Sequence, residues 1–135
     1  MENIPSKTKV VLPKVILVLL ALEFLLGTLA SLYQEVPEGV AKNNVYKPAG
    51  LIFFHVIVAT TLFVLGLLFM VRTKMQNQSR KAIGASIGGF VCIVLALISG
   101  VLFIQTANDI FSFVMMFFGL GAILSYAQIV YAKNQ

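Results

Sequence analysis

The chain has 135 residues, of which 59% are hydrophobic and 11% charged, and its mean hydropathy is +0.96. This composition excludes a soluble globular domain, and because a bilayer-spanning helix needs about 20 consecutive apolar residues, it leaves room for about four spans. The net charge is +5, but the basic residues flank apolar runs and do not cluster on a folded soluble face, which indicates membrane topology and argues against nucleic acid as a partner.

Four apolar segments follow one another along the chain, and each is long enough to cross a hydrocarbon core of about 30 Å as a helix. Their predicted limits are residues 14–34, 49–71, 82–104 and 110–132. Uninterrupted apolar runs such as 62–70 exclude a β-barrel, which needs alternating apolar and polar residues. The sequence therefore predicts an all-α integral membrane protein, with residues 1–135 forming a single antiparallel four-helix bundle.

The basic residues set the predicted orientation. Those expected on one side of the membrane are Lys7, Lys9, Lys14, Arg72, Lys74, Arg80, Lys81 and Lys133, and those on the other are Lys42 and Lys47. By the positive-inside rule, both termini and the loop 72–81 are cytoplasmic, and residues 35–48 form an outer loop. The first apolar run is too long for a signal peptide, so we interpret it as a retained span of a multi-pass cell-membrane protein.

In the first span, Glu23 lies close to the expected midplane. It shares one helical face with Gly27, Ala30, Ser31 and Gln34. An ionisable residue at this depth is a functional candidate. We expect it to share a proton with Thr60 or Thr61, which lie at similar depth. It either relays protons or pairs with a cation, or it is a carboxyl that links two helices by a hydrogen bond.

In the second span, His55 shares a face with Ala59, Leu62 and Gly66. It lies about 9 Å from the outer boundary, which leaves a gap of about 7 Å to Glu23 along the membrane normal. Side chains lean toward the N-terminus of their own helix, so in antiparallel helices this gap widens. We expect no direct hydrogen bond between the two residues unless the helices shift or a water bridges them.

The third span carries a small residue at every fourth position. The members of this stripe are Gly84, Gly88, Cys92, Ala96 and Gly100. Small residues let helix backbones approach closely, so the stripe predicts a helix contact, within the chain or with a second protomer. Cys92 is the only cysteine, which excludes an internal disulfide, and we interpret it as a packing residue.

The fourth span is preceded by Asn108, which with Asp109 is expected to cap the helix. Near its start it gathers large apolar side chains, namely Phe111, Phe113, Met115, Met116, Phe117 and Phe118. These either pack the bundle or line a pocket for a flat apolar ligand such as a porphyrin, quinone or sterol. Met115 or Met116 with His55 would make a pair of axial haem ligands. Alternatively, His55 from two protomers forms a bis-histidine site, or His55 bonds a backbone carbonyl.

Three segments carry a resemblance to a known family: LEFLLGTLASLYQ, FFHVIVATTLFVLG and SGVLFIQTANDIFSFVMMFFGLGAILSYA. Over residues 15–132 the chain resembles one four-helix half of haem A synthase, and also small four-span membrane proteins of bacteria and archaea. The resemblance rests on Gly27, His55, Gly100 and hydropathy. It implies that His55 is a haem ligand, whereas the fourth span has no histidine to match the second ligand of such a half.

Two functions follow from these features. The first is a non-enzymatic membrane subunit or accessory protein that binds haem or an apolar ligand near the outer leaflet through His55. The second is a small proton-coupled transporter that uses Glu23 as a homodimer, by resemblance to the small multidrug transporters. The sequence offers no Ser, His and Asp set at one depth, no metal-ligand cluster and no phosphate loop, so it argues against an enzyme. The expected surroundings are the lipid bilayer and a homodimer or larger membrane complex.

Overall fold

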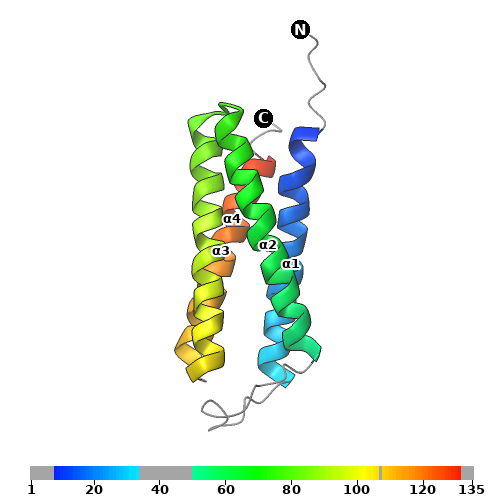
Figure 1. Cartoon of the computed structure of the whole chain (residues 1–135), viewed down its shortest axis with the longest axis vertical. Coiled ribbons are helices and arrows are strands. Elements are labelled where there is room, and N and C mark those ends of the chain that lie inside the picture. Colours follow the sequence, from blue (N-terminus) through cyan, green and yellow to red (C-terminus); the bar gives the residue numbers. More distant parts are fainter. Residues whose placement is uncertain (1–7, 34–49, 107, 132–135) are drawn as a thin grey trace.

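The computed structural model describes residues 8–33, 50–106 and 108–131, with only the backbone of residues 8–10 and 30–33. The described chain forms four helices: α1 (Thr8–Tyr33), α2 (Gly50–Met75), α3 (Arg80–Thr106) and α4 (Asp109–Tyr131), shown in Figure 1. Each of the four is long and apolar enough to cross a membrane. The predicted all-α, multi-pass character of the protein is thereby confirmed, whereas the outer loop 35–48 lies outside the described residues.

The helices extend beyond the apolar runs that predicted them. Helix α1 begins at Thr8 and contains Pro13, and α2 continues past Arg72 and Lys74 to Met75. A helix satisfies its own backbone hydrogen bonds, so it has no need to end where the hydrocarbon ends and continues into the polar interface. Hydropathy therefore located the spans but not their polar ends.

A tight turn joins α2 to α3. Asn77 has a φ of 45°, in the left-handed region that asparagine tolerates better than most residues. The N–H of Asn77 donates to the Lys74 carbonyl and that of Gln78 to the Thr73 carbonyl, at 3.2 and 3.5 Å, which is the Schellman pattern that closes a helix. The hydroxyl of Ser79 then accepts from Ala82 N–H at 3.3 Å and opens α3.

Helix α4 begins with the cap that the sequence predicts. The side-chain oxygen of Asn108 accepts a hydrogen bond from the N–H of Ile110 at 3.0 Å. Asp109 occupies the first turn, where its negative charge is favoured by the helix dipole. Both residues therefore act on the start of the helix, with Asn108 as the capping residue.

The four helices enclose one apolar core, with α1 next to α2 and α4, and α3 next to α2 and α4 (Figure 1). Its buried members are Ile16, Leu20, Leu62, Phe69, Ile93, Ala122, Tyr126 and Ile129. The fully buried ring of Tyr126 fits between two glycines on neighbouring helices. A Cβ at Gly89 would lie 2.7 Å from Tyr126 Cε2, and one at Gly66 would lie 3.3 Å from its hydroxyl. The ring therefore leaves no room for a Cβ at Gly89, whereas a Cβ at Gly66 would require the hydroxyl to move by a few tenths of an ångström.

The small-residue stripe of α3 packs against α4 of the same chain. A Cβ at Gly100 would lie 3.2 Å from the sulfur of Met115, and one at Gly121 would lie 3.0 Å from the sulfur of Cys92. Gly84, at one end of the stripe, has no described atom within 4 Å of its Cβ position. The stripe thus brings the two backbones together within one chain over most of its length.

Candidate functional site

The two ionisable residues that the sequence places inside the membrane meet at the α1–α2 interface. Glu23 lies in the middle of α1, and His55 lies in the second turn of α2. The distance between His55 Nδ1 and Glu23 Oε1 is 3.1 Å, and the two side chains are 19% and 15% exposed. The contact joins two adjacent helices within segments that are apolar enough to span a membrane.

The pair retains unused hydrogen-bonding capacity. The Nδ1–Oε1 distance is that of an ion pair, but the ring nitrogen does not have the alignment of a hydrogen bond, and neither Nδ1 nor Glu23 Oε2 has a hydrogen-bond partner among the described residues. Polar atoms buried without partners are costly in an apolar environment. A proton placed between Nδ1 and Oε1 would bond these two atoms and leave Oε2 as a further acceptor, so the pair can bind protons.

The expected separation of Glu23 and His55 is wrong. Counting the rise per residue treats the helices as parallel rods and ignores what lies between the side chains. Gly27, one turn along α1 from Glu23, leaves space for the imidazole, and a Cβ there would lie 3.1 Å from His55 Cε1. The ring therefore lies against the surface of α1 and reaches the carboxylate across one helical turn.

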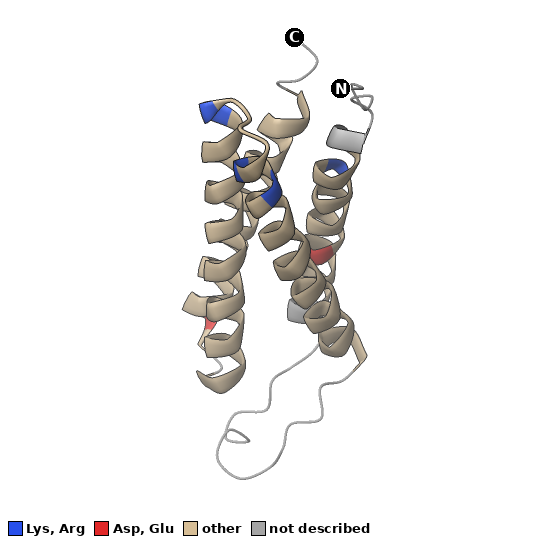
Figure 2. Ribbon diagram, turned by 45° about the horizontal axis from the view of Figure 1, so that its top comes forward, with Lys and Arg blue, Asp and Glu red and all other residues tan. Residues whose placement is uncertain are grey.

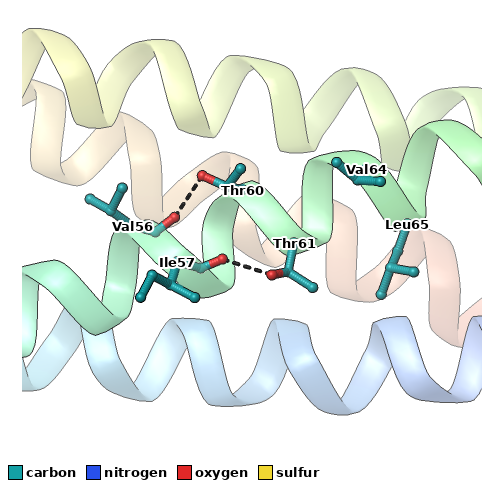
Figure 3. Close-up of a pocket in the computed structure, with 6 residues that line it drawn as sticks. All are labelled: Val56, Ile57, Thr60, Thr61, Val64 and Leu65. Carbon is teal, nitrogen blue, oxygen red and sulfur yellow. Dashed lines mark hydrogen bonds between the residues drawn. The ribbon is translucent and has the colours of Figure 1, made fainter.

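Thr60 and Thr61 do not join the pair in this structure. Their hydroxyls donate to the carbonyls of Val56 and Ile57 on the same helix, each at 2.8 Å (Figure 3). Both side chains are exposed, and together with Val56, Ile57, Val64 and Leu65 they line a shallow groove of about 430 Å³ along α2. Their protons are thus committed to the backbone of α2, and a proton shared with Glu23 stays a prediction.

Met115 and Met116 lie on another part of the bundle. Met115 packs against Gly100 on α3, whereas His55 packs against Gly27 on α1. Met116 is 42% exposed. The described contacts therefore place the sulfur of Met115 and the imidazole at two different helix interfaces, and an axial pair for haem stays a prediction. In the described ranges no group of three or more His, Cys, Asp or Glu side chains is placed to hold a metal ion.

One polar residue of the interior was not singled out from the sequence. Tyr126 is fully buried, and its hydroxyl has no hydrogen-bond partner within the part of the chain that the structure describes. Nothing in the sequence of α4 marks it, because the space for its ring comes from Gly66 and Gly89 on other helices. Its ring also packs on Phe69, with the ring centroids 5.8 Å apart, so we assign Tyr126 to the core.

The site can hold a proton, or a cation, between a carboxylate and an imidazole. Glu23 Oε1 and His55 Nδ1 face each other there, while the missing side chain of Gly27 leaves space for the ring. No protein-family model, curated protein or solved structure matches the chain.

Proposed function

We propose that the protein is a small proton-coupled transporter of the cell membrane and that the Glu23–His55 pair is its proton-binding site. The observation that carries this proposal is the 3.1 Å contact between the two side chains in the membrane-spanning part of the chain. Ionisable residues are costly within a bilayer and typically mark ion pathways or proton relays. The Nδ1–Oε1 contact lacks the alignment of a hydrogen bond and Oε2 has no described hydrogen-bond partner, which supports proton exchange over a purely structural contact.

The charge of the pair depends on how many protons it holds. With none, the carboxylate gives the site a charge of −1; one proton makes it neutral overall, and two make it +1. At low dielectric such changes act strongly on a nearby ion. A cationic substrate is therefore attracted to the unprotonated site and repelled from the doubly protonated one, which couples its movement to proton uptake.

We further propose an antiparallel bundle with both termini in the cytoplasm, working as a homodimer. Contacts from Gly88 to Ser125 and from Gly100 to Met115, which run in opposite directions along α3 and α4, support the antiparallel arrangement. The gathering of Lys and Arg at one end of the bundle supports the orientation (Figure 2). Only 11–17% of each span is buried inside one chain, which leaves apolar faces for a second copy.

The experiment is transport into liposomes that contain the purified protein and a pH-sensitive dye. An imposed pH gradient should drive uptake of cationic compounds from a test panel, and their addition should release protons. Glu23→Gln and His55→Gln should each abolish the coupled flux. Asp109→Asn removes an exposed carboxylate at the start of α4 and serves as the matched control. Coupled flux that survives Glu23→Gln would refute the proposal.

A second candidate is a non-enzymatic accessory protein that carries haem or another apolar ligand through His55. It is favoured by the carboxylate beside Nδ1, because a histidine that binds a metal commonly has its other nitrogen oriented by such a group. In the described residues the chain supplies His55 as one ligand, and Met115 packs elsewhere. A Soret band that disappears in His55→Ala would support this function. Unchanged haem absorbance on titration with the protein would exclude it.

A further inference from the structure

The described cations gather at one end of the bundle. They are Lys14 on α1, Arg72 and Lys74 on α2, and Arg80 and Lys81 on α3. Figure 2 shows their ribbon segments near the end where α2 turns into α3. All five side chains are exposed. We refer to these five residues as the basic rim.

The basic rim has no described negative charge to balance it. The described carboxylates are Glu23, which lies against His55 in the span, and Asp109, which begins α4. Glu23–His55 is also the one ion pair formed among the described residues. Within residues 8–33, 50–106 and 108–131 the five cations therefore form no salt bridge that holds the fold together.

The turn between α2 and α3 fixes the backbone on either side of which four of these cations lie. The Schellman bonds at Asn77 and the Ser79 cap close both helices within residues 76–79. Arg72 and Lys74 therefore precede, and Arg80 and Lys81 follow, a turn whose backbone is hydrogen-bonded on both sides. The backbone that carries the four cations is therefore ordered before an anion binds, and binding does not have to order the turn.

We propose that the basic rim binds the headgroups of anionic phospholipids in the surrounding leaflet. The cations lie at the ends of helices that are long enough to span the membrane, so they come to the level of the lipid phosphates. Long Lys and Arg side chains extend to this level from the ends of membrane helices. The position on spanning helices favours a lipid phosphate over a free phosphate from solution. This binding is independent of the proton site and of the direction in which the chain is inserted.

The proposal is tested by electron paramagnetic resonance of the full chain reconstituted in phosphatidylcholine vesicles with spin-labelled lipids. The measured quantity is the association of labelled phosphatidylglycerol relative to labelled phosphatidylcholine. A cation near the membrane surface contributes about a fivefold preference, so the wild type should favour phosphatidylglycerol at least about fivefold at low salt. The preference should fall as salt is raised, because salt screens exposed charges.

Two double variants test whether the anionic lipid binds at the basic rim. Arg72→Gln with Lys74→Gln, and Arg80→Gln with Lys81→Gln, should each lower the preference without abolishing it, because each removes two of the five cations of the basic rim. Each double variant still has more basic residues on the predicted cytoplasmic side of the membrane than on the outer side, so the orientation of the chain should persist. Lys42→Gln with Lys47→Gln makes the same change in net charge elsewhere and should leave the preference unchanged. Arg80→Lys retains the positive charge and should also retain the preference for phosphatidylglycerol.

Three results would overturn the proposal. They are equal association of the two lipids with the wild type, an equal loss of preference in the Lys42 and Lys47 variant, or displacement of the labelled lipid by inorganic phosphate beyond that caused by sodium chloride at the same ionic strength. The last result would assign the rim to a free anion. Circular dichroism of every variant checks that the helices have formed. If one double variant fails to fold, the other double variant and the single variant Arg80→Lys still show whether the lipid preference depends on the charges of the basic rim.

Discussion

Replacing Gly27 by alanine tests the packing that brings His55 to Glu23. The new Cβ would lie 3.1 Å from His55 Cε1, whereas carbon atoms in good contact are about 3.5–4.0 Å apart. The imidazole must therefore retreat from α1 by a few tenths of an ångström, and this retreat also disturbs the neighbouring ring atom Nδ1, which lies 3.1 Å from Glu23 Oε1. Alanine inside a helix is otherwise better than glycine by about 0.5–1 kcal/mol. We expect the strained contact to cancel this gain.

Gly84 provides the matched control, because no described atom lies within 4 Å of its Cβ position. Gly84→Ala should raise the free energy of unfolding by about 0.5–1 kcal/mol, whereas Gly27→Ala should leave it unchanged or lower it by up to about 1 kcal/mol. Gly27→Leu should lower it by about 1–3 kcal/mol. The assay is reversible unfolding in mixed micelles of dodecyl maltoside and sodium dodecyl sulfate, followed by circular dichroism. If Gly27→Ala stabilises the protein as much as Gly84→Ala does, the contact between His55 and α1 is not as described.

Further substitutions test the core and the α2–α3 turn by the same unfolding assay. Gly89→Ala should lower the free energy of unfolding by about 1–3 kcal/mol, because its Cβ would lie 2.7 Å from Tyr126 Cε2; an unchanged midpoint would contradict the close fit. Tyr126→Phe removes a buried hydroxyl that has no described partner, so stability should stay the same or rise by up to about 1 kcal/mol, and a clear loss would reveal a hydrogen bond at this hydroxyl. Asn77→Gly relieves a φ of 45° and should raise stability by up to about 1 kcal/mol, whereas Asn77→Ala should lower it.

The sequence contained most of the information on the helices. Long apolar runs predict where the chain crosses the membrane, since backbone groups in lipid must be satisfied within the segment. The stripe from Gly84 to Gly100 likewise predicts a close helix contact, and the structure identifies α4 as its partner. The polar ends of α1 and α2 were missed because a helix continues beyond the hydrocarbon, where hydropathy carries no signal.

The candidate site was predictable residue by residue but not as an arrangement. Glu23 and His55 stand out because each is an ionisable side chain in an apolar segment. Their contact depends on how α1 and α2 lie against each other and on the missing side chain at Gly27, and neither can be obtained from a count of residues along each helix. The commitment of Thr60 and Thr61 to backbone carbonyls was equally hidden, since it depends on the rotamer of each side chain.

The pairing of Glu23 with His55 can be observed directly by NMR, because the chain has a single histidine. Labelling histidine with ¹⁵N and incorporating the protein into lipid nanodiscs yields an NMR spectrum in which the ring signals belong to His55 alone. If Glu23 lies beside Nδ1, Glu23→Gln should move the Nδ1 signal by more than its linewidth at fixed pH, whereas Asp109→Asn should leave it in place. Superimposable spectra of the wild type and Glu23→Gln would contradict the pairing and, with it, the proposed proton site.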